Sequence, residues 1–144
     1  MREGALAGTF RLTAGSLHKT PFTKSMVTAA PDVLRSARHA ASVLLDSKAN
    51  DVVLLDLREV TDMTDYFIVA SGTSDTHVRA TAQHVIAALQ RDGTTLQSVE
   101  GFDGGRWVLL DYVDFVVHVF HPALRTFYQL ERLWGDALTV SVSP

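Results

Sequence analysis

The sequence contains no cysteine and no long hydrophobic run. Without cysteine the chain has no disulfide, no thiolate metal site and no thiol nucleophile. No stretch approaches the roughly 18 to 20 consecutive apolar residues that a membrane-spanning helix needs, so we do not expect a membrane protein. The cysteine-free composition suits a reducing compartment, and we therefore expect a cytoplasmic location.

The chain also lacks a net positive charge. Its 13 lysines and arginines stand against 16 acidic residues, which gives a formal net charge of −3. Non-specific binding to phosphate backbones needs an overall basic surface, so the composition argues against that class of nucleic-acid binder, although a local basic patch stays compatible with it. With 144 residues, 47% of them hydrophobic and 20% charged, the sequence is typical of one globular domain with a real core.

Residues 1–30 differ in composition from the rest of the chain. They are rich in Gly, Ser, Thr and Ala, and Glu3 is their only acid. They lack the apolar core of a secretory signal, but the same composition is found in organelle transit peptides and in leader sequences. We predict a disordered N-terminal extension, either a leader with Met26 as the native start or a transit peptide that would place the protein in mitochondria or plastids.

The remaining sequence alternates between helical and strand patterns. Apolar residues at helical spacing predict helices, and short β-branched or aliphatic runs predict strands. Ser74 is the expected N-cap of the second helix. In chain order we expect a helix at 32–48, strands at 52–57 and 66–70, a helix from 75 to about 91, strands at 95–99, 106–111 and 114–120, and a helix at 122–134. This order predicts an α+β fold, an α/β sandwich around a mixed five-stranded sheet.

The last two predicted strands form a hairpin whose side chains separate onto two faces. A two-residue turn at Tyr112–Val113 would place Asp111 opposite Asp114, and Trp107 opposite His118. One face is apolar throughout and suits the core: Val108, Leu110, Phe115, Val117 and Val119. The other face mixes apolar, aromatic and polar side chains: Trp107, Leu109, Asp111, Asp114, Val116, His118 and Phe120.

This mixed second face has two interpretations. Aromatic and polar side chains together are typical of protein-binding patches. Alternatively, a helix of the same chain covers the face, as in a sheet with helices on both sides. The two acids of the turn would repel each other unless a partner supplied a cation or backbone donors.

The sequence offers little support for catalysis or metal binding. His77 and His84 lie on one helix but two turns apart, roughly 10 Å, which is too far to share one ion. His118 and His121 are expected to be structural. The Ser71–Ser74 turn before the second helix could bind an anion, but it lacks the lysine and glycine spacing of a P-loop, and no close carboxylate pair follows it. We therefore expect no catalytic residues, no metal and no cofactor.

Several blocks of the sequence resemble the RsfS/Iojap family of ribosomal silencing factors. They are Thr64–Ser74, Glu100–Gly101, Trp107–Tyr112, Asp114–Phe120 and Phe127–Trp134. They follow one another in order over about residues 32–136, which makes them far more specific than a single short motif. The resemblance implies a nucleotidyltransferase-like fold without the catalytic carboxylates, and a domain at 31–137 followed by a C-terminal tail at 138–144.

The resemblance also implies a non-enzymatic function. Such proteins bind large-subunit ribosomal protein fourteen and sterically block joining of the small subunit, which represses translation, and they are often homodimers when free. Organelle members assist large-subunit assembly, and a nucleotide-binding enzyme that uses the Ser71–Ser74 turn is a further alternative. The acidic net charge favours contacts with ribosomal protein over ribosomal RNA. The partner-binding residues that the resemblance implies are Trp107, Leu109, Asp111, Tyr112, Asp114 and His118, with Tyr128 and Trp134 from the last helix.

Overall fold

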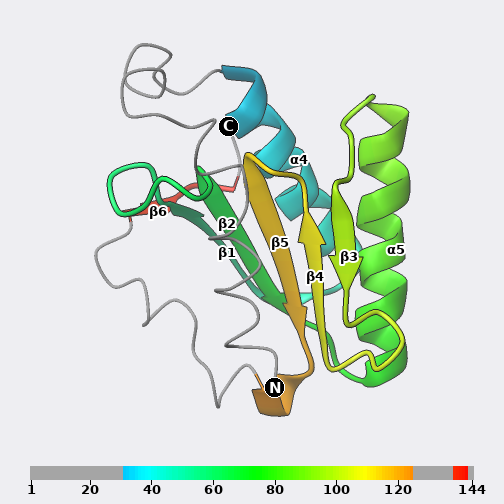
Figure 1. The fold of residues 1–144 in the computed structure, drawn as a ribbon. Coiled ribbons are helices and arrows are strands. Elements are labelled where there is room, and N and C mark those ends of the chain that lie inside the picture. The colour runs from blue at the N-terminus through cyan, green and yellow to red at the C-terminus, as the bar shows by residue number, and fades with distance from the viewer. Residues whose placement is uncertain (1–30, 125–137, 143–144) are drawn as a thin grey trace.

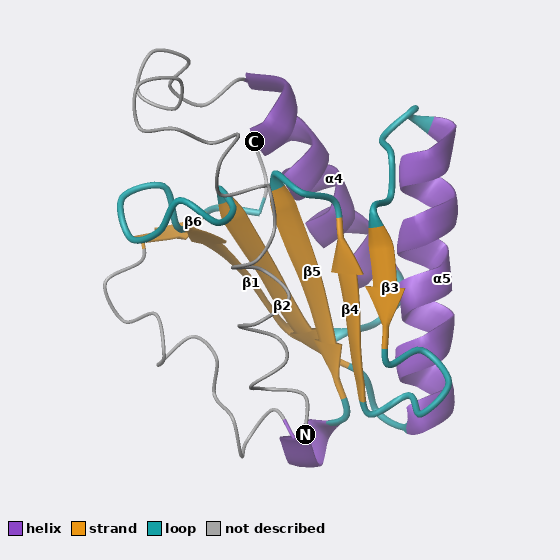
Figure 2. Cartoon of the chain, viewed as in Figure 1, coloured by secondary structure: helices purple, strands orange, loops and turns teal. Residues whose placement is uncertain are grey.

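The structure, a computed structural model, describes residues 31–124 and 138–142 of the chain. These residues form a mixed six-stranded sheet with two helices on one of its faces (Figures 1 and 2). In chain order the elements are α4 (Pro31–Asp46), β1 (Asn50–Asp56), β2 (Tyr66–Ser71), α5 (Asp75–Arg91), β3 (Ser98–Glu100), β4 (Trp107–Asp111), β5 (Phe115–Phe120) and β6 (Leu138–Val140). The predicted α+β class is confirmed.

The strands follow the order β3-β4-β5-β2-β1-β6 across the sheet. Neighbouring strands are antiparallel, except β2 and β5, which run parallel at its centre. Every residue of these two central strands is buried. Their continuous apolar runs fit this position, because a central strand covered on both faces exposes no side chain to water.

Helix α5 is built as the sequence predicts. The Oγ of Ser74 accepts a hydrogen bond from the backbone N–H of His77 at 3.1 Å, which is the expected N-cap contact. The helix buries its apolar stripe against the sheet, including Val78, Val85 and Leu89. None of the helices in the part of the chain that the structure describes is long and apolar enough to cross a membrane.

Two hydrophobic clusters lie on opposite faces of the sheet because side chains alternate along each strand. The helix-side cluster packs α4 and α5 on residues such as Ile68, Leu110 and Val117. The far-side cluster contains Leu55, Leu57, Phe67, Val69, Leu109, Val116 and Phe120, with Trp107 packed against it. The predicted division of the hairpin into a core face and a second face is therefore confirmed.

The number of strands was predicted wrongly as five. The sixth, β6, lies within residues 138–144, which we predicted to be a tail, and pairs antiparallel with β1 at the sheet edge. Val140 packs against the helix-side cluster. A three-residue strand is too short to give an alternating pattern in the sequence.

Two other predicted elements differ at their ends. The strand predicted at 95–99 is observed at Ser98–Glu100, and residues 94–97 approach it as irregular chain whose Gln97 N–H donates to the carbonyl oxygen of Asp111 at 2.7 Å. Of the helix predicted at 122–134, residues 122–124 are helical and the remainder lies outside the described residues.

The register predicted for the β4–β5 hairpin is wrong by two residues. Asp111 faces Val116, and Trp107 faces Phe120. The two-residue turn is Val113–Asp114, closed by a hydrogen bond from the Tyr112 N–H to the Phe115 carbonyl oxygen at 3.0 Å. Because the shift is even, each side chain keeps its face.

Contacts with the start of β2 favour this turn. The carbonyl oxygen of Asp114 accepts hydrogen bonds from the backbone N–H groups of Asp65 and Tyr66, and Thr64 Oγ1 donates to the carbonyl oxygen of Val113 at 3.0 Å. The predicted repulsion between Asp111 and Asp114 as opposed residues does not arise, since the two are not paired across the ladder.

Candidate partner-binding surface

The far-side cluster carries an aromatic group centred on His118. The imidazole lies edge-on to Phe67, with ring centroids 4.5 Å apart, and stacks with Phe120 at 6.2 Å. The indole of Trp107 packs against Phe120 at 4.8 Å and donates from Nε1 to His118 Nδ1 at 3.2 Å. Strands β2, β4 and β5 therefore bring together four rings on the face of the sheet opposite both described helices.

Burial determines the protonation state of His118. The side chain is fully buried, and the cost of removing the charged form from water lowers its pKa to about 3. The ring is therefore neutral near pH 7. Since Nδ1 accepts the indole hydrogen bond, the proton lies on Nε2, which has no hydrogen-bond partner within the described residues.

Three of the residues that we predicted to bind a partner, Trp107, Leu109 and Asp111, share this face with His118, whereas Asp114 lines a hollow beside α4. Trp107 is half-buried, whereas Leu109 is buried in the far-side cluster. Asp111 and Asp114 lie half-buried at the hairpin tip. Within the described part of the chain, Trp107 and the two acids are thus the predicted partner-binding residues that reach solvent.

The carboxylate of Asp111 shapes the hairpin tip. Its Oδ1 accepts a hydrogen bond from the backbone N–H of Val113 at 2.8 Å. Burial raises the pKa of Asp111, and this hydrogen bond opposes the rise. The contact holds Val113 at a φ of +73°, in a tight turn in which the Asp114 N–H donates back to the Tyr112 carbonyl oxygen. A β-branched residue at positive φ is strained, so the tip is a stressed part of the backbone.

Tyr112 does not join the other predicted residues. It lies on the opposite face, in the helix-side cluster, where its ring stacks on Phe115 with centroids 5.0 Å apart. Tyr128 and Trp134 lie outside the described residues.

Sequence reasoning missed the contribution of β1 and β2 to this face. Leu55, Leu57, Phe67 and Val69 join the hairpin residues there. Their alternation with Leu54, Tyr66 and Ile68 was present in the sequence as a signal. It could not be used alone, because alternation does not say which strands are neighbours or which face each set shares.

In the Ser71–Ser74 turn, the alternative site for an anion or nucleotide, two backbone donors are already bonded within the chain. The Gly72 N–H donates to the Phe120 carbonyl oxygen at 2.8 Å, and the Thr73 N–H donates to His77 Nδ1 at 2.9 Å. The Ser74 hydroxyl caps α5. An anion would have to displace these contacts and approach the carboxylate of Asp75, so the geometry speaks against this alternative.

The two histidines of α5 serve as links between the helices. His77 Nε2 donates to the Ser47 carbonyl oxygen at 2.7 Å, because its Nδ1 already accepts the Thr73 N–H. His84 Nδ1 and the Ser47 hydroxyl lie 2.8 Å apart. Both rings thus hold the end of α4 beside α5. Within residues 31–124 and 138–142, no three His, Asp or Glu side chains are arranged to hold a metal ion.

Comparison with known proteins identifies the family. The family model described as "Ribosomal silencing factor during starvation", RsfS, matches residues 30–144. The chain is 43% identical over 98 residues to the ribosomal silencing factor RsfS of Bacillus subtilis, and this match covers 68% of this chain and 83% of that protein. It is 30% identical over 96 residues to a Mus musculus protein named "Mitochondrial assembly of ribosomal large subunit protein 1", with 65% of this chain and 42% of that protein covered.

The fold is also found in a solved structure. A crystal structure of a protein from Chromobacterium violaceum superposes with a TM-score of 0.70 at 38% sequence identity, covering 72% of this chain and 86% of that one. The family model spans all the described elements, from α4 to β6. The chain therefore belongs to the RsfS family of ribosomal silencing factors.

Proposed function

We propose that this protein binds the large ribosomal subunit and sterically blocks its association with the small subunit, repressing translation. Membership of a silencing family supports a role in translation. The family resemblance implies that the protein docks on large-subunit ribosomal protein fourteen. We infer that the protein acts by binding without catalysis, as a cytoplasmic factor and as a homodimer when free.

We place the docking site at the aromatic group around Trp107. Its indole is half-buried and held by His118, on the face of the sheet away from α4 and α5. Tryptophan is enriched among the residues that dominate binding energy, because it combines a large apolar surface with one donor. The hydrogen bond to His118 fixes the ring before binding, which reduces the entropy lost on association.

The two acids near the hairpin tip indicate that the partner is basic where it contacts the edge of this surface. Asp111 and Asp114 are half-buried, and their carboxylates would meet basic side chains of a ribosomal protein. The net charge of −3 fits a partner that is protein more than RNA.

Sedimentation with purified ribosomal subunits tests this proposal. The wild-type protein should sediment with large subunits only and lower the yield of joined ribosomes. Trp107→Ala should weaken large-subunit binding by about 2 kcal/mol or more. Leu45→Ala is the matched control, since Leu45 is an exposed aliphatic residue of α4 on the other side of the molecule and its loss should leave binding unchanged. Failure of the wild type to bind either subunit would refute the proposal.

Assembly of the large subunit is a second candidate function, because the mouse relative is named for mitochondrial assembly of that subunit. Both functions would use one docking surface. Deleting the gene separates them: a silencing factor leaves large-subunit precursors at normal levels, whereas loss of an assembly factor makes them accumulate.

A further inference from the structure

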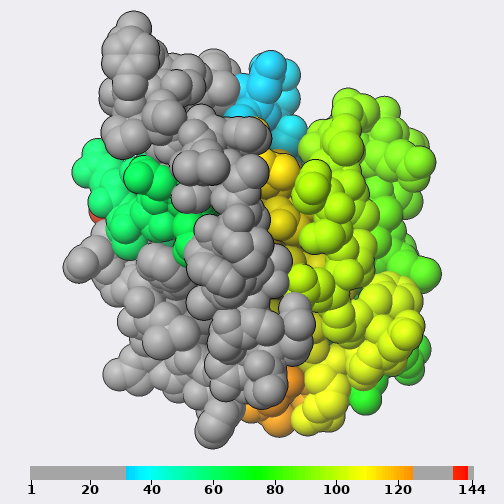
Figure 3. All heavy atoms as spheres, viewed as in Figure 1, coloured from blue at the N-terminus to red at the C-terminus, as the bar shows by residue number. Residues whose placement is uncertain are grey.

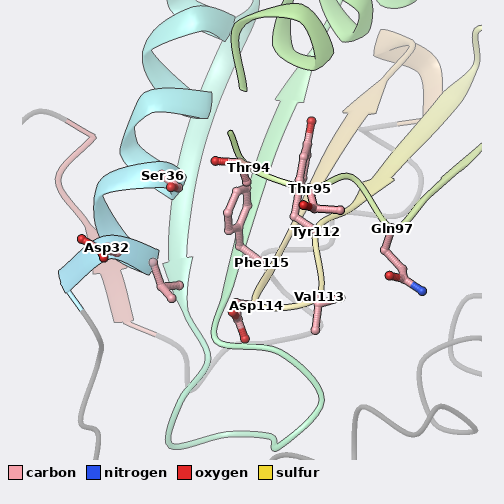
Figure 4. Close-up of a pocket in the computed structure, with 10 residues that line it drawn as sticks. Asp32, Ser36, Thr94, Thr95, Gln97, Tyr112, Val113, Asp114 and Phe115 are labelled. Carbon is pink, nitrogen blue, oxygen red and sulfur yellow. The ribbon is translucent and has the colours of Figure 1, made fainter. Parts of the chain in front are cut away.

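A notch opens where the hairpin tip meets the first turn of α4 and the chain that follows α5 (Figures 3 and 4). It consists of two adjoining hollows of about 320 and 430 Å³, which share Thr94, Thr95 and Tyr112. The remaining lining residues are Asp32, Val33, Ser36, Gln97, Val113, Asp114 and Phe115 in the first hollow and Ile86, Gln90, Gly93 and Leu96 in the second.

The hydroxyl of Tyr112 is the polar atom that this notch leaves without a partner. The side chain is 5% exposed, and its oxygen is buried with no hydrogen bond to the described residues. Figure 4 shows the ring rising from the hairpin with the hydroxyl directed toward α5, the helix that supplies Ile86 and Gln90 to the second hollow. Burial raises the pKa of this phenol to about 12. An unpaired buried hydroxyl is costly, so a ligand group that reached it would gain a hydrogen bond.

The charges around the notch are acidic. Among the described lining residues, Asp32 and Asp114 are the charged ones, and no lysine, arginine or histidine lines either hollow. The carboxyl-terminal end of α5 adds the negative end of a helix dipole. The amino-terminal end of α4 has the opposite sign, but Asp32 stands in its first turn as the countercharge. Asp32 also pairs with Arg35 at 3.4 Å, with both side chains mostly exposed, so this contact leaves the carboxylate accessible.

Aromatic and hydroxyl groups complete the walls. Tyr112 and Phe115 stack side by side, and Ser36, Thr94 and Thr95 offer hydroxyl oxygens. A guanidinium group can donate to a phenol, to hydroxyls and to carboxylates at once, and it packs well on aromatic rings. An anionic group would find acids in place of basic donors.

We propose that the notch receives an arginine side chain from an extended basic segment of a partner protein. The Tyr112 hydroxyl and the Asp114 carboxylate accept its N–H groups. The notch lies on the helix side of the sheet, whereas Trp107 lies on the far side. Asp114, at the hairpin tip, belongs to the notch and to the proposed ribosome-binding residues, so Trp107 is the residue that separates the two surfaces.

A titration of the full chain, followed by amide NMR signals, tests this inference. The probe is an acetylated, amidated Gly-Arg-Gly-Arg-Gly peptide, with Gly-Glu-Gly-Glu-Gly as the charge-reversed control. The arginine peptide should shift the amide signals of Thr95, Gln97, Val113 and Asp114, and the glutamate peptide should not. Shifts spread over all acidic surfaces, or no shifts at the notch, would overturn the proposal.

Two substitutions sharpen the test. Asp114→Asn should weaken peptide binding about threefold or more, as the loss of one charged contact, whereas Asp103→Asn, in the exposed β3–β4 loop, should leave it unchanged. Trp107→Ala should also leave it unchanged, which separates this site from the proposed ribosome-binding surface.

Tyr112→Phe distinguishes a binding hydroxyl from a structural one. Removing a buried hydroxyl without a partner should raise the melting temperature of the free protein by about 2 to 5 °C. The same variant should bind the arginine peptide about two- to tenfold more weakly. A variant that binds the peptide as tightly as the wild type would contradict the proposal, whatever its stability.

Discussion

The two faces of the sheet are built from the same strands but packed by different means. On the helix side, mainly aliphatic side chains such as Leu44, Ile68 and Val117 interlock under α4 and α5. On the far side, rings surround a buried histidine, and one hydrogen bond from Trp107 fixes their arrangement. Dispersion and hydrophobic burial have no preferred direction, whereas the ring and hydrogen-bond contacts do.

This difference gives the two faces different roles: the helix side mainly stabilises the fold, and the far side is suited to binding a partner. Among the described residues, the helix side has the larger apolar cluster and so the larger share of their hydrophobic stabilisation. The far side keeps polar atoms in a low-dielectric setting, where each unsatisfied group is costly and each fixed ring is ready to bind. Substitutions on the first face should lower stability through lost packing, and those on the second through protonation and lost hydrogen bonds.

The largest effect is expected on the helix side. Leu44→Ala removes a fully buried side chain of α4 and should lower the free energy of unfolding by about 2–5 kcal/mol, through lost burial and the cavity left behind. Chemical denaturation monitored by circular dichroism measures it. Leu45→Ala, at the next and half-exposed position, should cost much less; equal losses would mean that this face is not closely packed.

The second effect is a pH dependence on the far side. The folded-state pKa of His118, about 3, lies below its unfolded value near 6.5, so the unfolded chain takes up a proton first as the pH falls. Stability from this residue is complete above pH 6.5 and is lost below it, at about 1.4 kcal/mol per pH unit down to the folded-state pKa.

Comparing wild type with His118→Asn isolates this contribution. Urea denaturation gives the free energy of unfolding at pH 6.5 and at pH 4.5. Its decrease between these pH values should be about 2–3 kcal/mol larger in the wild type than in the variant, because asparagine does not titrate. Parallel losses in the two proteins would show that His118 is protonated in the folded state.

A smaller effect should follow from breaking the one hydrogen bond within the aromatic group. Trp107→Phe keeps a ring against Phe120 but leaves His118 Nδ1 without its donor, which should cost about 1–2 kcal/mol of stability. Thermal unfolding of wild type and variant gives the value. Introducing His118→Phe as well should remove most of this penalty, since the unsatisfied acceptor is gone; a strictly additive double variant would argue against the coupling.

The smallest effect concerns the hairpin tip, where the two faces meet. Val113→Gly should stabilise the protein by about 0.5–1 kcal/mol, because glycine accepts the φ of +73° without strain but loses more entropy on folding. Val113→Ala, which keeps a Cβ in the same conformation, should not stabilise to that extent. A destabilised glycine variant would show that the valine side chain contributes more by packing than its backbone strain costs.

Local patterns predicted much of the fold. The apolar spacing and the Ser74 cap located α5, and the aliphatic runs located β1, β2, β4 and β5 within one or two residues. Alternation also assigned Val108 and Leu110 to one face and Leu109 to the other. These signals are readable because each depends on residues a few positions apart.

The candidate site was less accessible to such reasoning. Its aromatic group needs Phe67 beside His118, two residues 51 positions apart that meet because β2 pairs with β5. Tyr112, taken with the second face because of the family motif, instead stacks on Phe115 under the helices. The face that Tyr112 takes depended on where the turn lies. The turn in its place depended on contacts with Thr64 and Asp65, in the loop before β2.

By itself the sequence determined α4, α5, the main strands and the face of each residue within strands β4 and β5, because helix and strand periods are set by backbone geometry within one segment. Only the tertiary structure decided the hairpin register, the short edge strand β6 and the burial of His118. Those features result from contacts between segments far apart in the chain, and their free energies arise only once the strands have been brought together.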